Sequence, residues 1–225
     1  FKPPDYEFRL TPIINFNHVE VEENRVLKAD PRLGRHRSDR HIALAEAFFD
    51  YHIRNVSDRY DFDSVRIGIQ PFSSDFRGFL FQDSQLGIRF FGDRDNNIFQ
   101  YNLAWFRRLE KDTNSLLNHI ERKIRDDDIF IANLYWQDFP VLGFQSQVTG
   151  VYNRNNEAGD FFFNDNEFIE RPASFGSERG RNYDVVYMGY NGDGHFDRLN
   201  LTTSFYTALG SNRDSAFTDE TADIQ

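Results

Sequence analysis

Most of this chain consists of segments in which polar and apolar residues alternate, joined by links that are short and long in turn. Eight segments have the composition of β-strands, and they are 42–55, 62–71, 84–91, 98–109, 128–138, 141–153, 183–190 and 196–209. Short links such as 92–97 and 191–195 join the two members of each pair. Long polar links at 72–83, 110–127 and 154–182 separate the pairs. An antiparallel sheet with short turns at one end and long loops at the other is the layout of an outer-membrane β-barrel.

The side chains within these segments follow the two-residue period of a strand. In the first segment Phe49 and Tyr51 share the apolar face, whereas Glu46 and Asp50 share the polar face. The other segments repeat this contrast. Four apolar residues interrupt the polar faces of two segments, and they are Ala104, Phe106, Ile129 and Ile131. The pattern predicts a sheet with one apolar face and one face rich in ionisable groups.

The composition limits what such a chain can be. A formal net charge of -10 at pH 7 disfavours nucleic acid as a partner. The absence of cysteine excludes disulfides, thiolate metal sites and cysteine nucleophiles. No stretch approaches the roughly 20 apolar residues that a membrane-spanning helix needs, and the mean hydropathy is -0.66. A low mean hydropathy is compatible with a β-barrel, because only alternate strand residues face lipid.

No motif for catalysis or metal binding stands out. The six histidines are scattered, without the HxH or HExxH spacing that zinc sites use. No GxSxG, Walker or GxGxxG element occurs, and carboxylates are too abundant in this acidic chain to single out a catalytic pair. We therefore expect no enzymatic activity, no metal and no cofactor.

Two features favour a membrane barrel over a soluble sandwich, whose polar face would simply be in water. Aromatic residues lie near the strand ends, as in interfacial girdles, and they include Tyr51, Trp105, Trp136, Tyr152, Tyr190 and Tyr206. The segments, of about 8–14 residues, suit the roughly 9–11 residues that cross a bilayer at a tilt. The sequence therefore predicts an all-β fold: an antiparallel transmembrane β-barrel, or an arc of a larger one, with short periplasmic turns and long extracellular loops.

The chain divides into three parts. Residues 1–41 are expected to supply one or two N-terminal strands, interrupted at Pro12, and a charged connection. Residues 42–210 hold the barrel strands, and residues 211–225 form a polar, loop-like tail. We expect the sequence to be a piece of a longer protein, because it shows neither a signal peptide nor a closing strand.

Charged residues on the predicted polar faces are the candidate functional residues, and they are Glu46, Asp50, Arg54, Arg66, Arg89 and Arg108. In a barrel they would line the lumen, because a charge on the lipid face costs about 2–4 kcal/mol near the midplane. Opposed acidic and basic groups create a transverse field that selects among solutes. We expect Arg66, Arg89 and Arg108 to contact solutes, with the two acids as their counterparts.

Residues 71–115, beginning PFSSDFRGFLFQDSQLG, and residues 183–210 resemble large outer-membrane barrels of Gram-negative bacteria. The likeness is to porin-like proteins of the alginate-export type, and it is one of overall texture. It implies a place in the outer membrane, contact with its lipid, and passive diffusion of small hydrophilic solutes, including anionic or carbohydrate ones. Such barrels have many more strands than this chain and end in an aromatic closing strand.

Two other functions remain open on this sequence. One is a structural barrel that sleeves or anchors another protein of the cell envelope. The other is a soluble all-β domain that binds carbohydrate through its many aromatic residues, which include 25 Phe and 10 Tyr.

Overall fold

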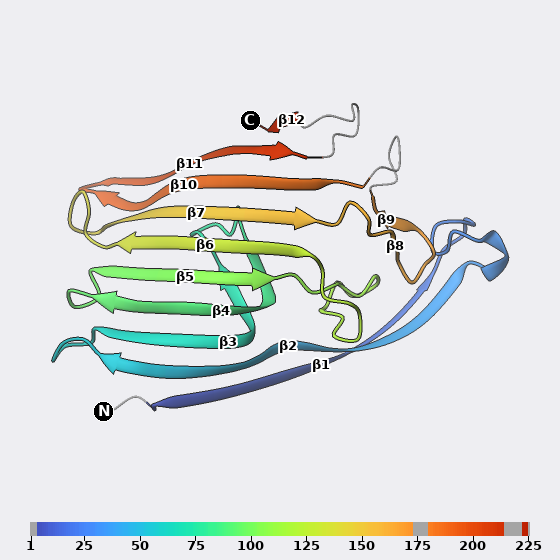
Figure 1. Cartoon of the computed structure of the whole chain (residues 1–225), viewed down its shortest axis with the longest axis horizontal. Helices are drawn as coiled ribbons and strands as arrows, with labels where there is room; N and C mark the ends of the chain where they lie inside the picture. The colour runs from blue at the N-terminus through green and yellow to red at the C-terminus, as the bar shows by residue number, and fades with distance from the viewer. Residues whose placement is uncertain (1–3, 173–179, 214–221, 225) are drawn as a thin grey trace.

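The computed structural model of the chain describes residues 4–172, 180–213 and 222–224. One ten-stranded antiparallel sheet dominates it, and its strands lie side by side in chain order (Figure 1). The strands are β1 (Tyr6–Glu20), β2 (His36–Asn55), β3 (Phe62–Ser73), β4 (Gln82–Arg94), β5 (Phe99–Arg107), β6 (Asp127–Trp136), β7 (Phe144–Asn156), β10 (Asn182–Phe196), β11 (Leu199–Asn212) and β12 (Ala222–Ile224). A small separate sheet pairs β8 (Phe162–Phe163) with β9 (Ile169–Arg171), and a 3-10 helix spans Pro31–Leu33. The prediction of an all-β, antiparallel fold is confirmed.

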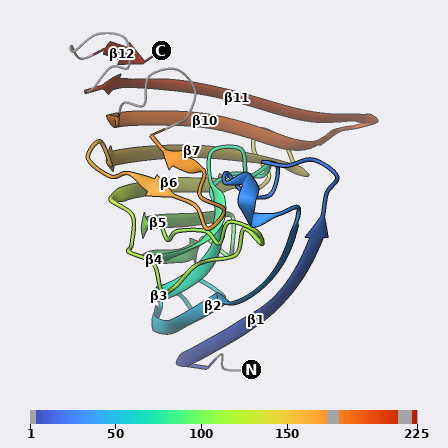
Figure 2. The same cartoon turned by 90° about the vertical axis from the view of Figure 1, so that its right-hand side faces the viewer.

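The links are sorted by length between the two ends of the sheet. Short turns join β2 to β3, β4 to β5, β6 to β7 and β10 to β11 at one end, and longer links lie at the other, the long-loop end (Figure 1). Figure 2 shows the sheet bent into an arc. Its hydrogen-bonded order runs from β1 to β12 without returning, so the described sheet is not closed into a barrel. None of the helical structure in the described ranges is long and apolar enough to cross a membrane.

The N-terminal part and the tail differ in detail from the predicted division. β2 begins at His36, so the charged residues 36–41 belong to a strand rather than to an exposed connection. β1 runs through Pro12 with only a register shift beside it, which is where a strand tolerates the missing N–H. Of the predicted tail, 211–225, the described residues complete β11 and form β12, and the rest lies outside the described residues.

The turn between β10 and β11 is not where the sequence predicts it. The Asn-Gly-Asp-Gly run at 191–194 lies within β10, and the chain reverses at Asp197 and Arg198. The glycines serve close packing instead: a Cβ on Gly194 would lie 2.4 Å from the carbonyl oxygen of Gly143. Asp197 supplies the left-handed backbone of the turn, with φ of 54°.

The two faces of the sheet differ in polarity as predicted, but their exposure is the reverse of that in a soluble sandwich. On β7, Val148 is 59% exposed, whereas the neighbouring Gln147 is fully buried. Exposed apolar side chains of the convex face include Phe49, Ile67, Leu103, Phe130, Leu134 and Met188. Buried polar side chains of the concave face include Gln70, Gln85, Asn102, Asn133 and Thr149. Apolar residues therefore point outward and polar residues point inward.

A glycine pair tests how closely the strands approach one another. A Cβ on Gly68 of β3, where φ is +128°, would lie 2.2 Å from the carbonyl oxygen of Ala47, whereas one on Gly150 of β7 would meet nothing nearer than 4.0 Å. We expect Gly68→Ala to lower the free energy of unfolding by roughly 1–3 kcal/mol. Gly150→Ala should change it by less than about 0.5 kcal/mol. Urea unfolding followed by tryptophan fluorescence measures both, and equal effects would contradict the close approach of β3 to β2.

Candidate functional site

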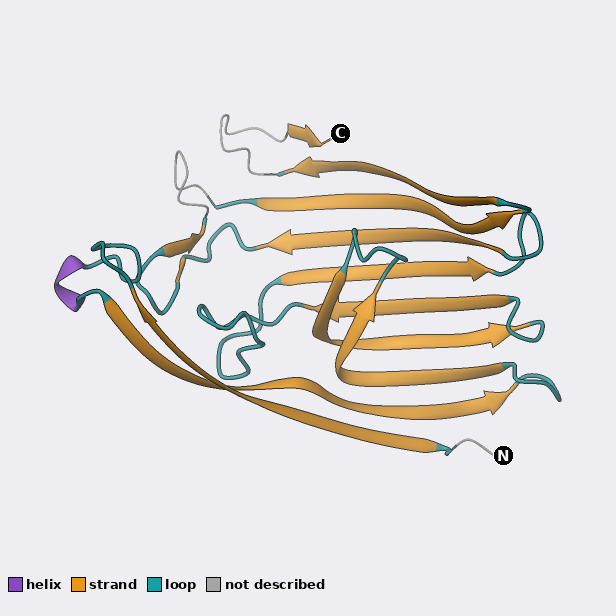
Figure 3. Cartoon of the chain, turned by 180° about the vertical axis from the view of Figure 1, so that it is seen from behind, coloured by secondary structure: helices purple, strands orange, loops and turns teal. Residues whose placement is uncertain are grey.

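The connection between β3 and β4 occupies the concave face of the sheet. We call residues 72–83 the inner hairpin. It turns inward at the long-loop end and crosses the face of the neighbouring strands (Figure 3). The sequence predicts an outer loop here, and the segment does lie at the expected end of the sheet. It folds back over the concave face, however, because that face supplies its hydrogen-bond partners.

The backbone carbonyl oxygen of Ser74 holds the inner hairpin to strands β6 and β7, which we call the wall strands. It accepts hydrogen bonds from Asn133 Nδ2 at 3.0 Å, and from Gln147 Nε2 and Thr149 Oγ1 at 2.9 Å each. Gln147 Oε1 in turn accepts the backbone N–H of Phe76 at 3.0 Å. The three donor side chains are buried on β6 and β7. Leaving such a buried group without its partner costs about 1–3 kcal/mol, so these contacts select the docked position.

The carboxylate of Asp75 sets the shape of the inner hairpin. It accepts hydrogen bonds of 3.0–3.1 Å from the backbone N–H groups of Arg77, Phe79 and Leu80, from the Ser74 hydroxyl and from the Tyr206 hydroxyl. Burial alone would raise the pKa of Asp75. The hydrogen bonds from Leu80, Phe79, Ser74 and Arg77 together outweigh burial and hold that pKa below its ordinary value of 3.8. Asp75 is therefore charged, and its charge favours the compact hairpin.

Apolar side chains pack the base of the inner hairpin against β5, β6 and β7. The rings of Phe72 and Phe81 lie with centroids 5.4 Å and 5.3 Å from that of Phe106 on β5. The same buried cluster contains Ala104, Ile129, Ile131 and Val151. The apolar residues that interrupt the polar faces of β5 and β6 thus lie where the inner hairpin covers them.

A row of polar side chains crosses the concave face and ends at the inner hairpin. Asp50 on β2 pairs with Arg66 on β3, with Oδ2 2.7 Å from Nη2. Arg66 is the register partner of Arg89 on β4. Arg89 Nε donates to Asn102 Oδ1 at 2.6 Å, and Asn102 Nδ2 donates to Asn133 Oδ1 at 2.8 Å. We call these five residues the arginine row.

The arginine row has more positive than negative charge. Asp50 is the one acidic residue among the five, and it pairs with Arg66. Arg89 donates instead to the neutral amide of Asn102. Aromatic rings support both cations: the guanidinium carbon of Arg66 lies 4.2 Å from the Phe48 centroid, and that of Arg89 lies 4.3 Å from the Phe91 centroid. Such rings attract a cation without neutralising it. The arrangement can therefore attract an anion to the concave face.

Arg108 belongs to a second charged cluster, at the long-loop end of the sheet. Its Nε lies 3.4 Å from Asp127 Oδ2, which is also 3.6 Å from Arg125 Nη2. Arg125 donates to both carboxylate oxygens of Glu157, at 3.0 and 2.7 Å. Burial alone would raise the pKa of Glu157, but the hydrogen bonds from Arg125 outweigh it and lower that pKa. Opposite charges are matched here, so the cluster ties the long loops together.

Glu46 and Arg54 lie apart from the arginine row. Glu46 is on the concave face beside β1, where it accepts a hydrogen bond from Thr11 Oγ1 at 2.9 Å. The expectation that Arg54 shares this face is wrong. A register shift just before Arg54 places it opposite Asp63, to which its Nε donates at 2.8 Å. Asp63 lies two residues before Val65 and is therefore on the apolar face. The register shift of one residue moves the Arg54 side chain to that same face.

The sequence does not predict the contacts between the inner hairpin and strands β5 to β7. Two sequence features are consistent with these contacts. Asp75 followed by Gly78 is typical of a compact turn, and the apolar residues Phe106 and Ile129 interrupt otherwise polar faces. Neither feature says which wall residues receive the hairpin, because Gln147 is 71 positions away from Phe76.

No protein-family model matches the chain, and no curated protein matches it in sequence. Within the described ranges, no group of three or more His, Asp or Glu side chains is placed to hold a metal ion.

Removing the Asp75 carboxylate should release the inner hairpin. Asp75→Ala leaves three backbone N–H groups without their acceptor, so the hairpin should open more often. We expect trypsin to cut after Arg77 roughly tenfold faster than in the wild type. Limited proteolysis with mass spectrometry of the fragments measures the rate. Asp58→Ala, in the exposed turn between β2 and β3, is the matched control, and equal cleavage in both variants would contradict the role of Asp75.

The docking of the inner hairpin should depend on pH. The folded pKa of Asp75 is lowered, so its stabilising contribution is present above the ordinary value of 3.8 and is lost as the pH falls below it. We expect the hydrogen-exchange protection of the Phe79 and Leu80 amides, corrected for intrinsic rates, to fall as the pH drops from about 4 to about 2. Asp75→Asn should abolish this pH dependence. Unchanged protection at pH 2 in the wild type would contradict the assignment.

Proposed function

We propose that this chain is a wall of a porin-like channel in the outer membrane of a Gram-negative bacterium. Small hydrophilic solutes, anionic or carbohydrate, diffuse passively along its concave face. The observation that carries the proposal is the reversed exposure of the two faces. In water, a broad exposed face of Val, Phe, Ile, Leu and Trp side chains would be an unstable surface. In a bilayer the same apolar face would contact the hydrocarbon chains of the lipid.

The backbone of the sheet also fits this proposal. A bilayer provides no hydrogen-bond partners, so a spanning β-structure must pair its strands fully. In the described part of the chain, β1 and most of β11 pair with a strand on one side only. We therefore propose that further strands pair with these edges in the membrane and complete a barrel.

Aromatic side chains lie near both ends of the convex face. At the long-loop end, Trp105 Nε1 donates to Asp128, and the Tyr152 hydroxyl donates to Asp184, at 2.9 Å each. Trp136 lies at the short-turn end, at the last position of β6. Trp and Tyr prefer the membrane–water interface, where one part of the ring is apolar and the other is hydrated. Their positions support a band of lipid between the two levels.

The concave face supports the choice of solute. The excess positive charge of the arginine row would attract anions. Aromatic rings of the inner hairpin also face β6 and β11: Phe76 lies 5.5 Å from Tyr135, and Phe79 lies 4.7 Å from Tyr206, between ring centroids. Phe79 is 70% exposed. Exposed rings of this kind offer flat apolar surfaces to sugar rings beside the charged groups.

Detergent dependence tests the membrane location. We expect the purified full-length protein to stay monodisperse in detergent and to aggregate when the detergent is removed, because its convex face would then meet water. Size-exclusion chromatography with light scattering measures this. A monodisperse protein in plain buffer would instead support the soluble carbohydrate-binding alternative.

Ion selectivity tests the arginine row. We expect the full-length protein to give ohmic current steps in planar bilayers, with anions preferred. The double variant Arg66→Gln, Arg89→Gln should lower the anion-to-cation permeability ratio by roughly threefold to tenfold, because it removes the field of two cations. Reversal potentials in a salt gradient measure the ratio. Arg198→Gln, in the turn between β10 and β11, is the control, and equal ratios in both variants would contradict the proposal.

The inner hairpin favours a second candidate function. It fills part of the concave face and is held by buried hydrogen bonds, as a plug would be. A plugged barrel would anchor or sleeve another protein of the cell envelope. It would depend on detergent but would give no current steps, which separates it from the channel.

A further inference from the structure

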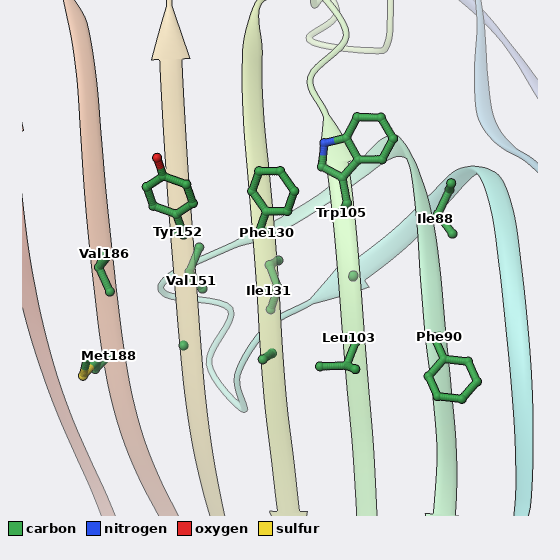
Figure 4. Close-up of a pocket in the computed structure, with 13 residues that line it drawn as sticks. Ile88, Phe90, Leu103, Trp105, Phe130, Ile131, Val151, Tyr152, Val186 and Met188 are labelled. Atoms are coloured by element: carbon green, nitrogen blue, oxygen red, sulfur yellow. The ribbon is translucent and has the colours of Figure 1, made fainter.

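A hollow of about 630 Å³ lies on the convex face, over β4, β5, β6, β7 and β10. Its volume is within the roughly 300–1,000 Å³ of small-molecule sites. Apolar side chains surround it, among them Leu103, Phe130, Val186 and Met188. Figure 4 shows Trp105, Phe130 and Tyr152 in a row across three adjacent strands, toward the end where β7 leads into its long loop.

Small residues form the floor of the hollow. Ala132 and Gly150 are register partners on β6 and β7. The backbone does not require glycine at position 150, because a Cβ there would meet nothing nearer than the Ala132 carbonyl oxygen at 4.0 Å. At the other described strand glycines a Cβ would lie within 3.0 Å of another atom, and these are Gly68, Gly87, Gly92, Gly189, Gly192, Gly194 and Gly210. The missing side chain at Gly150 therefore makes space rather than permitting a backbone approach.

A cation lies on the same face, beyond the row of aromatic residues. Arg154 follows Tyr152 by two positions on β7 and is exposed. It forms no ion pair or hydrogen bond within the described residues, although Asp128 and Asp184 are its register partners. Asp128 accepts from the Trp105 indole, and Asp184 accepts from Tyr152 and pairs with Arg213 at 2.9 Å. Arg154 remains available to a ligand.

We propose that the hollow binds one acyl chain of a phosphate-bearing membrane lipid, with the phosphate beside Arg154. This inference rests on the proposed membrane location. The hollow is continuous with the exposed apolar face, and Trp105 and Tyr152 mark the level where a bilayer interface would lie. An arginine just beyond that level is placed to pair with a lipid phosphate, while the acyl chain of the lipid lies over Gly150.

Native mass spectrometry of the full-length protein in a maltoside detergent tests this inference. Dipalmitoyl phosphatidylglycerol is titrated, and the dissociation constant of the first bound lipid is measured. We expect Gly150→Leu to weaken binding roughly tenfold, since it excludes about two methylene groups of the chain. Arg154→Gln should weaken it about fivefold. Val148→Leu, on the same face of β7 but outside the hollow, and Arg198→Gln are the matched controls and should bind as the wild type does. Ala132→Leu fills the same hollow from β6 and replaces Gly150→Leu if that variant does not fold.

The outcomes separate the lipid site from the proposed function. A protein that needs detergent but binds the lipid equally in all variants overturns the lipid site and leaves the membrane proposal standing. A dimer in light scattering that Gly150→Leu abolishes assigns the hollow to a second copy and also overturns the lipid site. A protein that is monodisperse without detergent overturns both proposals.

Discussion

The Ser74 carbonyl oxygen, with its three side-chain donors, is the contact on which the interior of this molecule depends. Asn133, Gln147 and Thr149 reach it from two adjacent strands, so the inner hairpin can dock only where β6 and β7 meet. Asn133 also accepts from Asn102, which receives the hydrogen bond of Arg89. One buried network therefore holds the hairpin and orients a cation, and its members strengthen one another in a medium of low polarity.

The reversed polarity of the two faces makes that network possible. Buried polar groups are stable only when they are hydrogen-bonded, and the concave face supplies both donors and acceptors. Arg66 has Asp50 as its counterion, whereas Arg89 has an amide and the ring of Phe91. The arginine row therefore carries two cations and one carboxylate.

Adjacent residues of one strand carry the two proposals. On β7, Thr149 faces inward and holds the inner hairpin, whereas Gly150 faces outward and forms the floor of the convex hollow. On β5, Asn102 belongs to the arginine row and Leu103 lines the hollow. The two-residue period of a strand places these side chains on opposite faces, so the solute site and the lipid site can be altered separately.

The sequence by itself determined the all-β class, the antiparallel order, the sorting of links by length and the contrast between the faces, because the two-residue period and turn residues act locally. Two predictions from the sequence were wrong: the face of Arg54 and the position of the turn at 191–194. A register shift decides the first and a close approach of strands the second, and both override the local pattern. Only the tertiary structure decided that the inner hairpin folds inward. Its partners are 59 to 75 positions distant in the chain, and no local preference specifies a contact between residues so far apart.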